Sequence, residues 1–60
     1  MTPSDLRKRR EALSLTMEAI AIAIGVPKGT YANWEHGRAN PSRAAQQKLE
    51  DCLYSLEHAG

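Results

Sequence analysis

The chain has 60 residues, which limits it to one domain, residues 1–60, with a small core that needs tight helical packing or self-association for stability. Its single cysteine, Cys52, excludes an internal disulfide framework and is typical of a reducing compartment, so we expect a cytoplasmic protein. The net charge of +1 gives no bulk attraction to nucleic acid, and the lack of a Cys/His set at zinc spacing or of a long apolar run argues against a metal site or a membrane segment.

The sequence predicts an all-α fold, because helix start and stop signals recur and the period-two alternation of a strand is absent. Thr2 can cap a first helix that runs from residue 3 to about residue 13. Thr16 can cap a second helix over residues 17–24, and Gly25 suits the left-handed residue that often ends a helix.

The turn at Val26-Pro27 predicts a third helix, which begins at residue 27 or 28, ends at His36 and is terminated by Gly37. Asn40-Pro41 combines a capping residue with a proline, which predicts a fourth helix over about residues 41–57. A break near the middle of this helix would give five helices instead of four.

The third helix divides into two arcs at about 100° per residue. One arc holds the only aromatic side chains that could anchor this helix to a core, and the other is polar or small. The first arc consists of Thr30, Tyr31, Trp34 and Glu35. The second arc consists of Lys28, Gly29, Ala32, Asn33 and His36. This division suits a recognition helix in the major groove, although an ordinary amphipathic surface helix would divide in the same way.

Charge is unevenly distributed along the chain. Residues 1–43 carry seven basic and four acidic side chains, whereas residues 44–60 carry one lysine and three acidic side chains. A basic body with an acidic C-terminal segment suits a protein that turns one face to phosphate and another to a partner.

Within residues 6–42, four short stretches occur at the spacing of a known family. They are Leu15-Thr16-Met17-Glu18-Ala19-Ile20-Ala21, Ile24-Gly25-Val26, Thr30-Tyr31, and Trp34-Glu35-His36-Gly37-Arg38 with Pro41. On these residues the chain resembles the lambda-repressor/Cro-type (XRE-type) helix-turn-helix family. The resemblance implies a lambda-repressor-like domain of four to five helices, with the helix-turn-helix at about residues 16–37.

The resemblance also implies a function. The implied protein is a non-enzymatic transcriptional repressor that binds double-stranded DNA as a homodimer on an inverted-repeat operator and regulates its own gene. No cofactor and no small-molecule ligand are expected. Small members of the family include phage repressors, antitoxin-type regulators and autorepressors of phage operons such as those encoding anti-CRISPR proteins, and the residues do not distinguish among them. The rival is a protein-interaction module of the same fold that does not read DNA, which the modest net charge favours.

Two sets of residues are candidates for contact with DNA. The base-reading set, implied by the resemblance, is Lys28, Gly29 and Asn33, with Ala32 between them. Lys28 can donate to guanine O6 and N7, and Asn33 can pair with adenine N6 and N7. Ala32 can touch a thymine methyl group or serve as a small filler. Candidates for contact with the DNA backbone are Thr16, Met17, Thr30, Tyr31, His36, Arg38 and Arg43.

Other residues match structural positions of the family. The resemblance places Tyr31 in the core, and this role is an alternative to a contact between its hydroxyl and phosphate. It also implies an ion pair between Arg10 and Glu35. Ala21 matches a small residue that lets the second and third helices approach closely. The remaining core positions implied in this way are Ile20, Ile24, Val26 and Trp34.

Three residues depart from the family pattern. Met17 stands where the family has glutamine, and its thioether cannot bond phosphate, which leaves this task to backbone N–H groups and the Thr16 hydroxyl. Gly29 either permits close approach to DNA or leaves one base unread. Ile22 stands where a polar residue is common, which favours contact with another helix or a second chain. The candidates for a dimer contact are Ile22, Leu49, Leu53 and Leu56, although the leucines could instead belong to the monomer core.

Overall fold

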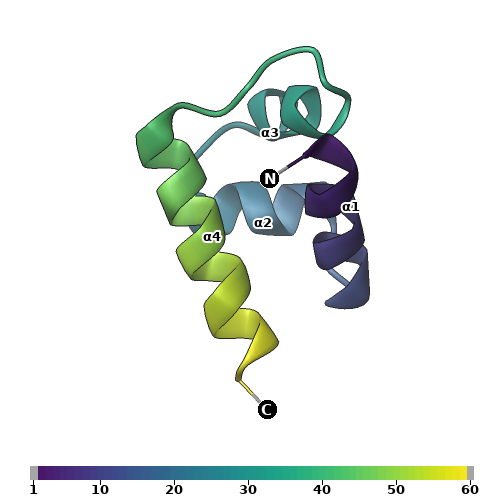
Figure 1. Cartoon of the computed structure of the whole chain (residues 1–60), viewed down its shortest axis with the longest axis vertical. Helices are drawn as coiled ribbons and strands as arrows, with labels where there is room; N and C mark the ends of the chain where they lie inside the picture. The colour runs from purple at the N-terminus through teal and green to yellow at the C-terminus, as the bar shows by residue number, and fades with distance from the viewer. Residues whose placement is uncertain (1, 60) are drawn as a thin grey trace.

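The computed structural model describes residues 2–59 and contains four helices and no strand within them (Figure 1). In chain order these helices are α1 (Pro3–Ala12), α2 (Met17–Ile24), α3 (Lys28–Glu35) and α4 (Arg43–Glu57). In Figure 1, α2 lies across the middle of the molecule with α3 above it, and α1 and α4 stand on either side. α2 packs against α3 and α4, and α1 packs against α3. The all-α prediction is confirmed, and no fifth helix forms because α4 is continuous over 15 residues.

Local capping chemistry sets the ends of the first two helices. The Thr2 hydroxyl accepts a hydrogen bond from the Asp5 N–H at 3.1 Å, and the Thr16 hydroxyl accepts one from the Ala19 N–H at 3.0 Å. Each bond satisfies one of the N–H groups that a helix start leaves without a partner. Gly25 ends α2 with φ of 78°, a left-handed conformation that a side chain would strain.

The start of α4 differs from the sequence-based prediction. The helix begins at Arg43 rather than Pro41, because the hydroxyl of Ser42 supplies the cap and accepts a hydrogen bond from the Ala45 N–H at 3.1 Å. Asn40 and Pro41 remain in the loop that leads to it. α3 likewise ends at Glu35, one residue earlier than expected, with His36 as its cap.

The core lies where α2 meets the other helices. Its aromatic part is Tyr31 and Trp34, whose rings meet edge to face with their centroids 5.9 Å apart. The buried apolar residues are Leu6, Ile20, Ala21, Ile24, Tyr31, Trp34, Leu49 and Leu53. Val26, expected in the core, is only partly buried and packs against its edge.

Burial corrects three of the sequence-based assignments. Tyr31 is 0% exposed, so its hydroxyl cannot reach the DNA backbone, and the core role is the one the structure gives it. Leu49 and Leu53 are also 0% exposed, because α4 turns them toward α2, and they are therefore unavailable for a dimer contact. Ile22 and Leu56 remain exposed.

A half-buried ion pair joins α1 to α3. The Arg10 guanidinium donates two hydrogen bonds to the Glu35 carboxylate, one of them 3.0 Å long, and a third to the Leu15 carbonyl at 2.7 Å. The side chains of Arg10 and Glu35 are 12% and 3% exposed. Burial alone would raise the pKa of Glu35, but the hydrogen bonds and positive charge of Arg10 outweigh it and lower that pKa. The pair therefore stays ionised and fixes α1, the following loop and α3 together.

The Tyr31 hydroxyl lies close to this pair. It is buried without a hydrogen bond to any residue within 2–59, which makes it an exception among buried polar atoms. Burial, reinforced by the negative charge of Glu35, raises the pKa of Tyr31 well above its ordinary value. The phenol therefore stays neutral at every pH at which the protein would work.

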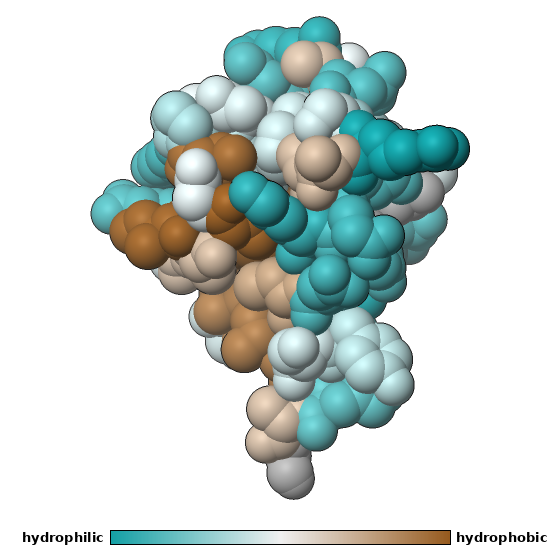
Figure 2. Space-filling model, turned by 90° about the vertical axis from the view of Figure 1, so that its left-hand side faces the viewer, coloured by the Kyte–Doolittle hydropathy of each residue, from teal (hydrophilic) through white to brown (hydrophobic). Residues whose placement is uncertain are grey.

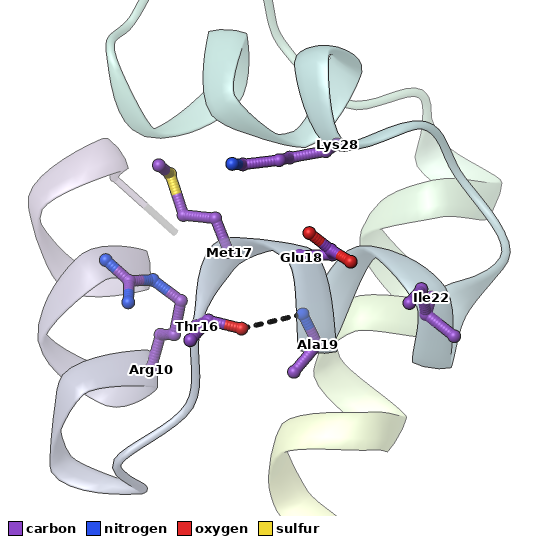
Figure 3. A pocket seen from close by; sticks show the side chains of 7 residues that line it. All are labelled: Arg10, Thr16, Met17, Glu18, Ala19, Ile22 and Lys28. Carbon is purple, nitrogen blue, oxygen red and sulfur yellow. Dashed lines mark hydrogen bonds between the residues drawn. The ribbon is translucent and has the colours of Figure 1, made fainter.

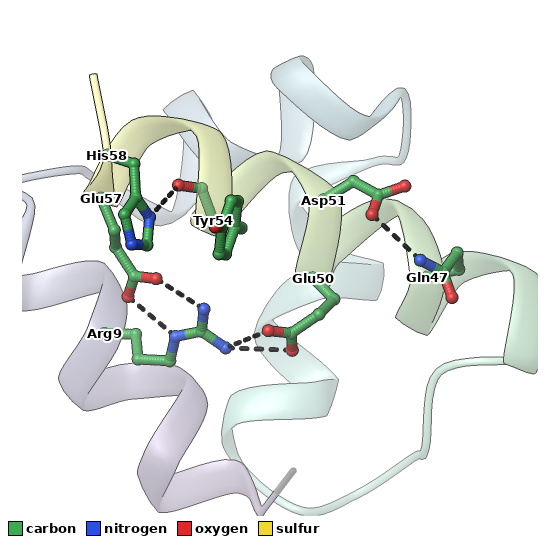
Figure 4. Close-up of polar contacts among 7 residues, drawn as sticks. All are labelled: Arg9, Gln47, Glu50, Asp51, Tyr54, Glu57 and His58. Carbon is green, nitrogen blue, oxygen red and sulfur yellow. Dashed lines mark hydrogen bonds and ion pairs between the residues drawn. The ribbon is translucent and has the colours of Figure 1, made fainter.

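A second ionic connection links α1 to the far end of α4, and sequence reasoning missed it. Arg9 donates to Glu57 at 2.7 and 2.9 Å and to both oxygens of Glu50 at 3.0 Å (Figure 4). The hydrogen bond from Arg9 lowers the pKa of Glu57. Figure 4 shows the guanidinium between the two carboxylates, so one residue of α1 holds two positions of α4 that lie about two helical turns apart.

Candidate nucleic-acid interface

A tight turn joins α2 to α3 and sets their relative orientation. The Val26 N–H donates to the Ala21 carbonyl at 2.9 Å, and the Gly25 N–H donates to the Ile22 carbonyl at 3.1 Å. Ala21 is 1% exposed, and α2 contacts α3 more extensively than it contacts α4. A small side chain at Ala21 is therefore consistent with the close approach of the two helices.

α3 is anchored on one side and open on the other. Tyr31 and Trp34 are buried, whereas Lys28, Gly29 and Thr30 are exposed. Thr30 was grouped with the aromatic residues, but it lies at the edge of their arc and faces solvent. No side chain in the described part of the chain caps the start of α3, so its first N–H groups are open to an external acceptor. The exposed side of α3 is thus the surface that can meet a ligand.

An open groove of about 710 Å³ lies between the beginnings of α2 and α3. Figure 3 shows Met17 and Lys28 extending toward one another across it, with Thr16 at the first turn of α2. The Thr16 oxygen accepts from the Ala19 N–H, which leaves its own O–H proton free to donate. The lining residues are Arg10, Thr16, Met17, Glu18, Ala19, Ile22 and Lys28.

Glu18 is a groove residue that the sequence reasoning did not single out. Its carboxylate suits the positive end of the α2 dipole, but it would repel a phosphate placed in the groove. Arg10 cannot offset this repulsion because Glu35 holds its guanidinium. Lys28 is therefore the one lining cation without an ion pair in the described part of the chain. The position of this acidic residue in the first turn of α2 was the sequence signal that could have identified it.

The middle of α3 offers polar groups next to small ones. Ala32 and Asn33 are half-buried, and the side-chain amide of Asn33 makes no hydrogen bond to any residue within 2–59. Its backbone carbonyl accepts from the N–H groups of Arg38 and Ala39 at 2.9 and 3.4 Å. These bonds tie the loop after α3 to the helix while the amide stays available to an external partner.

Three basic candidates lie outside the groove. His36 and Arg38 are exposed around the end of α3, and Arg43 is exposed at the start of α4. Neither arginine forms an ion pair within residues 2–59, so both can meet an external anion. The structure therefore brings Thr16, Met17 and Lys28 together and leaves His36, Arg38 and Arg43 around the loop between α3 and α4.

Comparison with known protein families places this geometry in context. Residues 6–53, more than half of the chain, match the family model described as helix-turn-helix. The match begins in α1 and extends into α4, so it includes the whole α2–turn–α3 unit. Curated proteins and solved structures gave no match. Within residues 2–59 no helix has the length and apolar character needed to cross a membrane.

Proposed function

The chain belongs to the XRE/Cro-type helix-turn-helix family, which is non-catalytic and binds DNA to regulate transcription, and from this premise we propose that it is a sequence-specific repressor. It acts as a homodimer on an inverted repeat in double-stranded DNA. Repression follows from occupancy, because a protein bound over a promoter excludes other proteins from it. The promoter of its own gene is the first expected target.

The observation that carries this proposal is the two-sided character of α3. Tyr31 and Trp34 fix the helix to the core. On the opposite side of the helix, the side chains of Lys28 and Asn33 form no ion pair or hydrogen bond with any residue within 2–59. A helix anchored in this way can enter the major groove, which is wide enough for one helix. Unsatisfied donors and acceptors on the entering side are what direct readout of base edges requires.

Each candidate group then has a distinct task. Lys28 donates to guanine O6 and N7, and Asn33 pairs with adenine N6 and N7. Gly29 and Ala32 allow the helix to approach the bases closely. Candidates for contact with phosphate are the Thr16 hydroxyl, the Met17 backbone N–H, Thr30, His36, Arg38 and Arg43.

A dimer is proposed because one α3 makes too few base contacts for useful affinity. Two copies on an inverted repeat double those contacts, and the centres of the half-sites would lie about one helical turn, or roughly 34–36 Å, apart. The occupied DNA would then exclude other proteins without any ligand-dependent step.

A gel shift with DNA from upstream of the chain's own gene tests the proposal. Arg38 and Arg43 from two copies supply four cations, so raising the salt from about 50 to 200 mM should weaken binding by about 100-fold. Asn33→Ala should relax the preference at one base position, at a cost of about 1–3 kcal/mol. A shift that is absent, or that is equal on unrelated DNA, would contradict sequence-specific repression.

The second candidate is a protein-interaction module of the same fold. Ile22, at 71% exposure, and the carboxylate of Glu18 in the groove favour it, because neither suits a surface pressed against phosphate. Such a module would give no salt-sensitive, sequence-dependent shift in the same experiment.

A further inference from the structure

An apolar band crosses the side of the molecule formed by α2 and α4. Figure 2 shows this face, where hydrophobic side chains gather in a strip bordered by hydrophilic ones. Two of the large apolar side chains that remain exposed are Ile22, at 71%, and Leu56, at 41%, and Leu56 lies one turn after Cys52, about 40° from it around α4. Ile22 and Ala23 of α2 line one open pocket together with Cys52 of α4. None of the base-reading candidates lines this pocket, so the base contacts proposed above leave it free.

α4 presents this band because its other sides are occupied. Leu49 and Leu53 face the core, and Glu50 and Glu57 hold Arg9 of α1. At about 100° per residue, Cys52 lies about 160° around the helix from Glu50. The side of α4 that carries Cys52 is thus turned away from the ionic connection, which holds the helix in place while leaving that side open.

The polar residues beside the band carry opposite charges. Lys48 and Asp51 line the same pocket as Ile22 and Cys52. Lys48 forms no ion pair within residues 2–59, and Asp51 accepts a hydrogen bond only from the neutral amide of Gln47, at 2.9 Å. In a twofold contact between identical chains, every contact occurs twice: if one residue of the first copy contacts a second residue of the other copy, the same two residues also meet with the copies exchanged. Two copies could therefore form two equivalent Lys48–Asp51 pairs around an apolar centre.

We propose that the band formed by Ile22, Ala23, Cys52 and Leu56 is the interface between two copies of this chain. We assign a second copy to this surface because a twofold axis places Lys48 of each copy opposite Asp51 of the other. A partner surface that carried charges of one sign only would place a like charge opposite either Lys48 or Asp51. Ile22 also lines the groove that holds Lys28. The interface therefore brings the two grooves close to the twofold axis, and its use on an inverted repeat rests on the proposed function.

The oligomeric state of the full chain without DNA tests this interface, measured by sedimentation equilibrium up to about 1 mM protein. The wild type should be a dimer. Ile22→Glu should raise the dimer dissociation constant by at least about 100-fold, because each dimer loses two buried isoleucines and gains two buried charges. Tyr54→Glu is the matched control, since Tyr54 is 59% exposed on α4 but stacks on His58 outside the band. It should remain dimeric, with circular dichroism confirming that both variants fold.

A charge exchange tests the twofold register independently. Lys48→Glu and Asp51→Lys should each weaken the dimer about tenfold, and the double variant should regain most of the loss. The single thiol, Cys52, gives a local readout, because its alkylation should slow as protein concentration rises in the wild type and not in Ile22→Glu.

A monomeric wild type, an Ile22→Glu variant as dimeric as Tyr54→Glu, or a double charge variant weaker than both single variants would each overturn the interface. A monomeric wild type that still binds an operator specifically would overturn the interface, and dimerisation before DNA binding with it, and would leave sequence-specific repression standing. A dimer of the expected behaviour that binds no DNA would contradict the repressor proposal and support the interface.

Discussion

Replacing Glu35 with glutamine removes one charge from the ion pair that joins α1 to α3. The side chains of Arg10 and Glu35 are 12% and 3% exposed, so Arg10 would keep its charge in a site with little water. Breaking a buried pair in this way costs about 3–5 kcal/mol, and the remaining amide oxygen should reduce the cost to about 2–3 kcal/mol. For a domain of this size, each kcal/mol lowers the melting temperature by about 4–8 °C, so a decrease of about 10–20 °C is expected.

Thermal and urea unfolding followed by circular dichroism would measure this loss. Glu11→Gln is the control, because the Arg7–Glu11 pair is 3.4 Å long with side chains 65% and 54% exposed, and its loss should cost less than about 0.5 kcal/mol. If Glu35→Gln at neutral pH were as stable as this control, the structural role of the pair would be refuted.

The same variant has a predicted pH dependence. The pKa of Glu35 is lower in the folded chain than in the unfolded chain, where a glutamate titrates at about 4.3. Its stabilising contribution is therefore fully present above that value and is lost as the pH falls through the lower, folded pKa. The stability difference between wild type and Glu35→Gln should shrink in acid, and a difference that stays constant down to strongly acidic pH would contradict the assignment.

Three further substitutions test the fold. Gly25→Ala should cost about 1–2 kcal/mol in urea unfolding, because φ of 78° is unfavourable for alanine even though no atom lies within 4 Å of the added Cβ. Leu53→Ala should cost about 2–5 kcal/mol by the same method, since the side chain is 0% exposed, whereas an effect below 1 kcal/mol would contradict its core position. Arg9→Gln should speed hydrogen exchange in the last turns of α4, where Glu50 and Glu57 lose their partner, and this effect should diminish at high salt.

Features that depend on neighbouring residues were predictable from the sequence. Thr2 and Thr16 cap their helices, and Gly25 ends α2, because each of these interactions spans only a few residues. The start of α4 could not be predicted to the residue, because Asn40 and Ser42 lie within three residues of one another and both can cap a helix. The tertiary structure uses Ser42, and the residues before it form the loop.

Features that depend on how helices rotate against one another were not predictable. The leucines of α4 share one helical period, yet Leu49 and Leu53 are 0% exposed and Leu56 is 41% exposed. The partners of Arg9 could not be identified from the sequence, because Glu50 and Glu57 are 41 and 48 residues away along the chain. Arg10 and Glu35 are also distant in sequence, and only the family resemblance indicated that they would pair.

The sequence indicated which residue types belong to the candidate site better than it indicated how they are arranged in space. Lys28 is exposed, and the Asn33 amide has no hydrogen bond to any residue within 2–59, so both groups are available to base edges as the base-reading prediction requires. The presence of Glu18 in the groove depends on how α2 and α3 are placed, which the spacing of residues alone does not determine.

Base discrimination measured by fluorescence anisotropy is the most direct test of whether the exposed side of α3 reads DNA. An operator selected from random duplexes would be compared with its single-base variants for the wild type, Lys28→Ala and Asn33→Ala, with the exposed Lys8→Ala on α1 as the control. We expect Lys28→Ala and Asn33→Ala each to lose about 1–3 kcal/mol of discrimination at one base position, while Lys8→Ala keeps the wild-type profile. Selection that enriches no sequence, or full discrimination in both α3 variants, would contradict the account.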